Sequence, residues 1–293
     1  RDSLYGLAQA SFEEQDEPTK SALEAYSRGV NAWIETVNAQ ALGRGAPEFF
    51  LFPPEIAHWQ PADSLAILKL LALQLTGQME REVLRARTSL LMPANRVQDI
   101  LPDVPGPGIA ALPDYASIVP NVAPSYAALS GPESAFDPVH PQLFAGASNA
   151  WAAAPSRSAS GGTLLANDPH LNFSAPTVWY LARLDLAGGG VIGGTIPGIP
   201  LVIVGRNADL GWALTSSYLD DQDLHIERLN PENSEEYLTP SGYKSFETRR
   251  AILSIKDAPP VTLTLRWTEN GPVLPGSHYD LGTVTPPGHV MSL

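Results

Sequence analysis

NAWAAA at residues 149–154 opens a run of five short apolar segments that decides the fold. The other four are GTLLA at 162–166, VWYLARLDL at 178–186, PLVIVG at 200–205 and LGWALT at 210–215. Glycine and proline separate the segments, which is typical of strands joined by turns. Similar segments lie at 223–229, 251–255 and 261–267, the last containing the alternating pattern TLTLRW. We therefore expect residues 148–293 to be rich in β-sheet.

Residues 1–92 carry helical periodicity instead. Between 20 and 39, apolar side chains recur at the spacing of one helix face: Leu23, Tyr26, Val30, Trp33, Ile34 and Val37. A second helical pattern runs almost without a break from Asp63, a plausible N-cap, to Leu91. Helices followed by strands indicate the α+β class.

Residues 93–147 separate the two parts. This segment contains ten prolines and few charges, and it shows no sustained period. We interpret it as a linker or as irregular surface structure.

Charge and composition exclude several classes of protein. The formal net charge is −13 and there is no basic stripe, so a nucleic-acid partner is not expected. The absence of cysteine rules out disulfides, thiolate catalysis and metal sites with Cys ligands. No apolar run reaches the roughly 18 residues of a membrane-spanning helix, so we expect no membrane partner.

Common catalytic motifs are also missing. The glycine cluster at 188–194 lies between strand-like segments, and we expect it to be a hairpin turn rather than a phosphate cradle. The segment at 146–150 approaches a nucleophile elbow, but its second glycine is replaced by Ala150. A strand is expected after Ser148, whereas the elbow needs a helix there, so a Ser-His-Asp hydrolase is disfavoured.

Ser148 fits a different kind of serine chemistry. A serine hydroxyl needs a base, and the α-amine of the same residue can act as that base once the chain is cut just before it. Such a serine should follow a proline-rich segment and open a strand, as Ser148 does. The alternative is that this serine is structurally incidental.

The residues around Ser148 resemble a known family. SNAW at 148–151 is similar to the segment that opens the β subunit of penicillin acylases and acyl-homoserine-lactone acylases. The resemblance continues, in order, through NDPHL at 167–171, PTVWY at 176–180, PGIP at 197–200, GRN at 205–207, GWA at 211–213 and GPV at 271–273. GVNAWI at 29–34 and LTGQ at 75–78 resemble the α subunit, so the resemblance covers about residues 20–92 and 144–275.

This resemblance implies a fold and a set of catalytic residues. The implied fold is the αββα four-layer sandwich of N-terminal-nucleophile hydrolases. The implied cleavage lies between Ala147 and Ser148, which then acts as nucleophile. His170 would lie near the freed amine, Leu171 would line the acyl pocket, and the backbone N–H of Ser216 would form half of the oxyanion hole. The second oxyanion donor is expected beyond Leu293, and a histidine hydrogen-bonded in a loop is the alternative for His170.

The family also implies a calcium site. Asp220 and Asp223 match family ligands, with the carbonyl of Gln222 between them, and oxygen ligands suit this hard cation. Glu82 is the candidate ligand from the α subunit, with Glu80 as the alternative. An acidic surface turn is the competing interpretation of Asp220 and Asp223.

Two positions depart from the family pattern. Ala147 stands where the family usually has glycine, which we expect to slow the cleavage step without preventing it. Asn270 stands where the family often has histidine before Gly-Pro, which leaves the role of this position open.

The resemblance implies an amidohydrolase that acts on small N-acyl amides, either acyl-homoserine lactones or β-lactam antibiotics. His170 replaces a glutamine seen in some penicillin G acylases, which favours the lactones slightly. The α and β chains would come from one precursor in the periplasm or outside the cell. The chain itself looks like an excerpt of that precursor, so a catalytically silent structural or binding fragment is the alternative.

Overall fold

The computed structural model describes residues 4–39, 56–92, 94–101, 148–171, 177–216, 219 and 222–293. The chain forms two compact units. Unit A comprises Asp2–Leu75 and Leu143–Ser217, and unit B comprises Thr76–Gln142 and Tyr218–Leu293 together with Arg1. Each unit thus combines helices from the first third of the chain with strands from residues 148–293, and the mixture of both confirms the α+β class.

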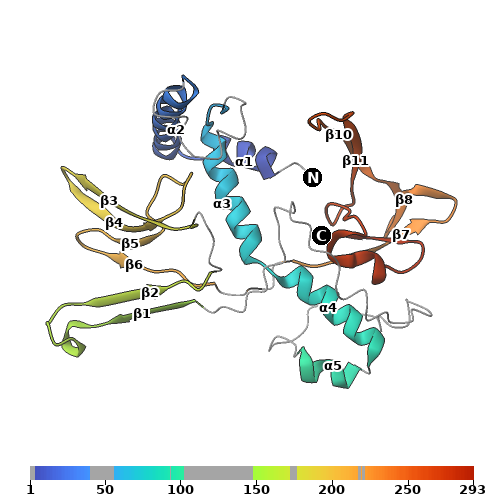
Figure 1. The fold of residues 1–293 in the computed structure, drawn as a ribbon. Coiled ribbons are helices and arrows are strands. Elements are labelled where there is room, and N and C mark those ends of the chain that lie inside the picture. The colour runs from blue at the N-terminus through green and yellow to red at the C-terminus, as the bar shows by residue number, and fades with distance from the viewer. Residues whose placement is uncertain are drawn as a thin grey trace. The chain divides into compact units, whose positions relative to one another are not determined.

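The described part of unit A contains helices α1 (Leu4–Glu13), α2 (Glu17–Asn38) and α3 (Pro61–Leu75), and the first two pack on the third (Figure 1). Helix α2 begins at Asp16, whose carboxylate accepts a hydrogen bond from the N–H of Thr19 at 2.9 Å, as an N-cap does. Its buried side chains include Leu23, Ile34 and Val37. These three lie on the face that the apolar spacing predicts, but Trp33, which the same spacing places on that face, is 54% exposed.

Two asparagines on α2 hold the chain segment that leads into α3. The side-chain amide of Asn31 donates to the carbonyl of Trp59 at 2.9 Å and accepts from its N–H at 2.6 Å. Asn38 makes the same pair of bonds with Ile56, both at 2.9 Å. Each asparagine therefore satisfies both polar groups of one backbone residue, which fixes this segment along the helix.

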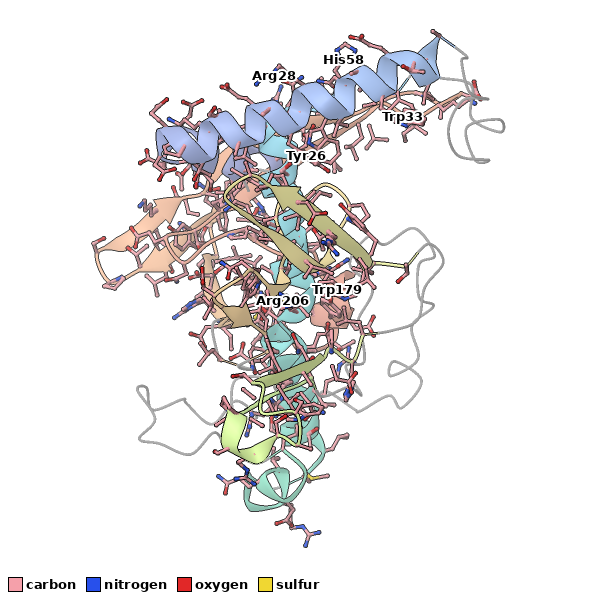
Figure 2. The ribbon with its side chains drawn as sticks, turned by 90° about the vertical axis from the view of Figure 1, so that its left-hand side faces the viewer. Tyr26, Arg28, Trp33, His58, Trp179 and Arg206 are labelled. Atoms are coloured by element: carbon pink, nitrogen blue, oxygen red, sulfur yellow. The ribbon has the colours of Figure 1, made fainter. Side chains whose placement is uncertain are left out.

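The same region of unit A receives the turn between β4 and β5. Gly198 adopts a φ of +92°, and a Cβ there would lie 3.0 Å from the ring of Trp59. Tyr26 lies on the side of α2 that faces the strands, whereas the exposed Arg28 lies on the opposite side (Figure 2). Burial raises the pKa of Tyr26, and a hydrogen bond with the backbone at Gly198 acts in the opposite direction. Only glycine meets both demands at position 198, positive φ and close packing.

The strands of unit A form two antiparallel sheets (Figure 1). Strands β1 (Asn149–Ala153) and β2 (Leu164–Asp168) form a two-stranded sheet, and a short 3₁₀ turn, Pro155–Arg157, follows β1. The four-stranded sheet has the order β3-β4-β5-β6, with bounds Tyr180–Leu186, Gly189–Thr195, Val204–Arg206 and Gly211–Trp212.

Strand β4 corrects the interpretation of the glycine cluster. The turn between β3 and β4 takes only the start of that cluster, and Gly189–Thr195 is a strand. A Cβ at Gly193 would overlap the carbonyl oxygen of Val204 on β5. The glycines therefore allow close approach of neighbouring strands, which glycine inside a strand often indicates.

The described part of unit B contains helices α4 (Gln78–Leu91) and α5 (Ala94–Ile100) and the strands β7 to β12. The four-stranded sheet has the order β12-β7-β8-β9, with bounds His289–Ser292, His225–Asn230, Asn233–Thr239 and Gly242–Ser245. Strands β10 (Glu247–Leu253) and β11 (Val261–Trp267) form a separate hairpin (Figure 1). The helical pattern of 63–91 is thus two helices, α3 and α4, which are interrupted at Thr76 and Gly77.

Helix α4 packs on the core of unit B through Val83, which is clustered with Leu281, Val284 and Met291. Leu281 and Val284 belong to or adjoin the 3₁₀ segment η5 (His278–Thr283). Arg87 reaches the same segment and lies 3.2 Å from the carboxylate of Asp280, which has a φ of 55°. The ion pair holds a backbone conformation that is uncommon outside glycine. No described helix is long and apolar enough to cross a membrane.

Candidate active site

Ser148 immediately precedes β1 in unit A and is half-buried. The first residue of β1, Asn149, is paired with Asp168, the last residue of β2. Because the hairpin is antiparallel, the residues just before β1 and just after β2 lie at the same end of it. The predicted nucleophile and His170 therefore lie at one end of one hairpin. Ala147, on the other side of the predicted cleavage, is outside the described residues.

The segment that carries Ser216 is joined to this hairpin by side chains. The amide of Asn167, on β2, donates to the carbonyl of Leu214 at 3.0 Å and accepts from its N–H at 3.0 Å. The hydroxyl of Thr215 donates to the carbonyl oxygen of Ser148 at 3.1 Å. Ser148 and Ser216 are thus brought into one neighbourhood of unit A, since Thr215 directly precedes Ser216.

His170 is exposed, and its Nε2 lies 2.8 Å from a carboxylate oxygen of Asp168. Among the described residues its imidazole has no hydrogen bond to Ser148. The Asp168 carboxylate fixes the direction of the ring, as a carboxylate beside a histidine commonly does. Leu171 follows it in the chain and is half-buried. The role of Leu171 in an acyl pocket stays a prediction.

The predicted calcium ligands belong to unit B and are only partly described. Asp220 lies outside the described residues, Gln222 is half-buried and Asp223 is exposed. Glu82, on α4, accepts a hydrogen bond from the N–H of Leu224 at 2.7 Å. Gln78, one turn earlier, donates to the carbonyl of Leu219 at 3.3 Å. Helix α4 therefore holds both sides of the acidic segment.

Glu82 and Glu80, the two candidate ligands on α4, have different partners. Glu82 contacts the residue next to Asp223, whereas Glu80 is half-buried and interacts with Tyr279. Burial raises the pKa of Glu80, and its hydrogen bond with Tyr279 acts against that shift. Carboxylates beside the 222–224 segment fit an oxygen-seeking cation. The described residues by themselves contain no group of three acidic or histidine side chains able to hold a metal ion.

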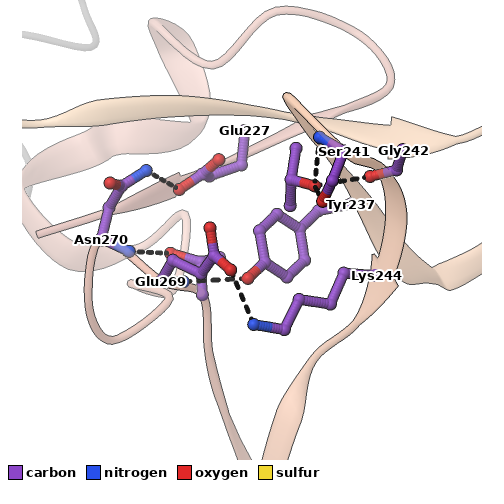
Figure 3. Close-up of polar contacts among 9 residues, drawn as sticks. Glu227, Tyr237, Ser241, Gly242, Lys244, Glu269 and Asn270 are labelled. Atoms are coloured by element: carbon purple, nitrogen blue, oxygen red, sulfur yellow. Dashed lines mark hydrogen bonds and ion pairs between the residues drawn. The ribbon is translucent and has the colours of Figure 1, made fainter.

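Asn270 is exposed, but its side chain reaches the buried carboxylate of Glu227 in unit B (Figure 3). Its side-chain amide donates to the carboxylate of Glu227 at 2.8 Å, and the hydroxyl of Ser292 donates to the same oxygen at 2.8 Å. Glu227 is 6% exposed. Asn270 thus supplies an N–H donor to a buried carboxylate.

Sequence reasoning did not single out Asn167, Asp168 or Thr215 as functional residues. Asn167 and Asp168 lie within the NDPHL segment, whose resemblance to known sequences was the one available signal. Thr215 carries no such signal, because its partner Ser148 is 67 positions away in the chain.

Comparison with known proteins shows the family of this chain. The family model described as penicillin amidase matches residues 3–291, and the chain belongs to that family.

Two relatives illustrate the match. An acyl-homoserine lactone acylase QuiP from Pseudomonas aeruginosa is 28% identical over 277 residues, which cover 93% of this chain and 32% of the relative. Penicillin acylase 2 proenzyme from Pseudomonas sp. (strain SE83) is 28% identical over 295 residues, covering 95% of this chain and 36% of the relative. The chain spans about a third of the length of these relatives.

One solved structure is also similar over part of the chain. A thermostable penicillin G acylase from Alcaligenes faecalis superimposes with a TM-score of 0.42 and 28% identity, covering 49% of this chain and 25% of that chain. The α+β class rests on the helices and strands of this chain itself.

Proposed function

We propose that the full-length protein hydrolyses the amide bond of N-acyl substrates, with Ser148 as nucleophile after cleavage of the Ala147–Ser148 bond. The observation that carries the proposal is the joining of two segments in unit A. Ser148 immediately precedes β1, and Thr215, beside Ser216, donates a hydrogen bond to the carbonyl oxygen of Ser148. Membership of the penicillin amidase family supports the reaction class. A catalytically silent fragment is not favoured by relatives that are themselves named acylases.

The first half of the proposed reaction forms an acyl-enzyme. The freed α-amine of Ser148 takes the proton of its own hydroxyl while Oγ attacks the acyl carbonyl. The tetrahedral oxyanion is stabilised by the backbone N–H of Ser216 and by a second donor not identified in this chain. When the C–N bond breaks, the proton on the α-amine passes to the leaving nitrogen, and the amine product departs.

In the second half, water replaces the amine. The α-amine of Ser148 accepts a proton from the attacking water, the ester bond to Oγ breaks, and the proton returns to Oγ. This step releases the carboxylic acid and regenerates the hydroxyl of Ser148. His170 contributes by orienting water or supporting the amine, and its own direction is set by Asp168.

The remaining features of the proposal concern the whole protein. The relative named a proenzyme supports one precursor that yields an α and a β chain. We further propose the αββα sandwich, a periplasmic or extracellular location, and a structural calcium ion. Asp220, Gln222, Asp223 and Glu82 would hold the ion, which would stabilise the segment that follows Ser216 in the chain.

The substrate class is tested directly on the full-length protein. Purified enzyme is incubated with acyl-homoserine lactones of several chain lengths and, separately, with penicillins, and the released amine and acid are measured by mass spectrometry. Several of the most similar relatives carry the name acyl-homoserine lactone acylase, so we expect release of homoserine lactone to be faster. Ser148→Ala is the control and should release neither product. Absence of amide hydrolysis with every substrate by a folded wild type would refute the proposal.

A further inference from the structure

Asn167 lies at the junction of three backbone segments in unit A. Its Nδ2 donates to the carbonyl of Asn149, on β1, at 2.9 Å. The same nitrogen donates to the carbonyl of Leu214 at 3.0 Å, and Oδ1 accepts from the N–H of Leu214 at 3.0 Å. A carboxamide has two N–H donors and one carbonyl acceptor, so every polar group of this side chain is used.

The bonds to Leu214 replace a strand pairing. Strands β1 and β2 form a two-stranded sheet of their own, and β6 belongs to a different sheet. Among the described strands, no backbone ladder therefore joins residues 214–215 to the hairpin. The amide of Asn167 exchanges one donated and one accepted hydrogen bond with Leu214, just as a backbone residue does across an antiparallel pair.

Two further contacts in unit A join the β1–β2 hairpin to residues 211–215. Thr215 bonds to the carbonyl of Ser148 at 3.1 Å. A Cβ at Gly211, on β6, would lie 2.7 Å from a methyl group of Leu165, on β2. The hairpin and the 211–215 segment are therefore in direct contact, but Asn167 is the residue that bonds to both sides at once.

We propose that Asn167 is a positioning residue. It fixes the start of β1, which follows the nucleophile Ser148, relative to residues 214–216, which carry the proposed oxyanion donor Ser216. Its bond to Asn149 places the residue next to Ser148, and its pair of bonds to Leu214 places the segment that ends at Ser216. The inference rests on the proposed function and assigns Asn167 no contact with substrate. Because attack at a carbonyl depends on the relative position of nucleophile and oxyanion donor, a displacement of about 1 Å can cost about 10²-fold in rate.

Asparagine is specified at this position by its mixed donor and acceptor character. Asn167→Asp keeps an oxygen for the N–H of Leu214 but turns another oxygen toward the carbonyls of Asn149 and Leu214. Asn167→Ala removes all three bonds. Both variants should let residues 214–216 shift relative to β1, and neither removes a group that binds substrate.

The test compares these variants with Asn38→Ala in the full-length protein. Asn38 lies in the same unit and makes two side-chain bonds to the backbone of Ile56, so its loss controls for lost hydrogen bonding. For each protein we would measure the melting temperature and the fraction of chains with a free N-terminal Ser148. We would also measure KM and kcat, with kcat expressed per free N-terminal serine. Asn167→Ala and Asn167→Asp should lower kcat per free serine by about 10²-fold with little change in KM, or should slow the cleavage itself. Asn38→Ala should lower only the melting temperature.

The outcomes separate the inference from the proposed function. Wild-type kcat and cleavage in Asn167→Ala would overturn the positioning role, as would an equal loss of kcat in Asn38→Ala. If Asn167→Ala does not fold, the decision rests on Asn167→Asp, and wild-type kcat per folded molecule there would also overturn the role. A wild type that is neither cleaved nor active would refute the proposed function itself.

Discussion

The hydroxyl of Thr215 donates a hydrogen bond to the carbonyl oxygen of Ser148 at 3.1 Å, although the two residues are 67 positions apart in the chain. This bond joins the residue expected to attack the substrate to the segment expected to stabilise the oxyanion. It uses the backbone of Ser148, so it leaves the Ser148 hydroxyl available for chemistry.

Thr215→Val removes this bond and retains the size and branching of the side chain. We expect kcat of the full-length enzyme to fall by up to about tenfold, since a typical hydrogen bond contributes roughly 0.5–1.5 kcal/mol. Thr215→Ser keeps the hydroxyl and should retain most of the activity. Steady-state kinetics on the cleaved enzyme measure the difference. Equal kcat in the valine and serine variants would show that the bond has no role in turnover.

His170→Ala should lower turnover by about 10²-fold, the low end for loss of an acid–base partner. Cleavage at Ala147–Ser148 should be affected less, because the nitrogen of Ser148 is an amide before the cut and cannot act as a base. Asp168→Asn is the matched variant: it retains the shape of the partner of His170 and should cause a smaller loss. Unchanged turnover in His170→Ala would reassign this residue to a loop hydrogen bond.

If the proposed calcium site exists, the protein should respond to chelation. EDTA should lower the melting temperature of the full-length protein or slow its cleavage. Glu82→Gln should lower the melting temperature and make it less sensitive to EDTA, because Glu82 contacts the segment that carries Asp223. Glu80→Gln is the control, since Glu80 interacts with Tyr279, and it should leave the EDTA effect intact. No effect of EDTA on either quantity would exclude a structural calcium ion.

The cluster around Glu227 makes a prediction about stability. Asn270→Ala leaves the buried carboxylate with one donor fewer, and we expect a loss of about 1–3 kcal/mol in the free energy of unfolding. Ser241→Ala, which removes a hydroxyl that bonds to Thr239 in the same unit, should cost less. Urea titration measures both. Asn270→His should fold, since histidine can also donate a hydrogen bond to this carboxylate. An Asn270→Ala variant no less stable than Ser241→Ala would contradict this account of the cluster.

Sequence patterns predicted the elements in which local periodicity and packing agree. Strand β11 lies at Val261–Trp267, where alternation predicts it, and the buried face of α2 contains Leu23, Ile34 and Val37. Strand β4 was missed because its glycines are read locally as a turn. Glycine is needed in β4 because β5 approaches it closely. This contact between strands cannot be read from the local sequence pattern.

The candidate site was predictable to the same limited degree. Ser148, His170 and Ser216 were reached through resemblance, and their roles stay predictions. The side chains that join their segments, Asn167 and Thr215, have partners 47 and 67 positions away. Which distant backbone groups such side chains meet is decided by the tertiary fold, so only the structure shows these contacts.

The central claim is that a cut before Ser148 creates the base for catalysis. Before the cut, the nitrogen of Ser148 is part of a planar, non-basic peptide bond. Afterwards it is an α-amine attached to the Cα of the nucleophile, with a reference pKa of about 7.7–8.0. The most direct measurement is the intact mass and N-terminal sequence of the purified full-length protein, compared with Ser148→Ala and assayed in parallel for amide hydrolysis. We predict two chains for the wild type, the second beginning Ser-Asn-Ala-Trp, and one inactive chain for Ser148→Ala. An uncut wild type that hydrolyses its substrate, or a fully active Ser148→Ala variant, would contradict the account.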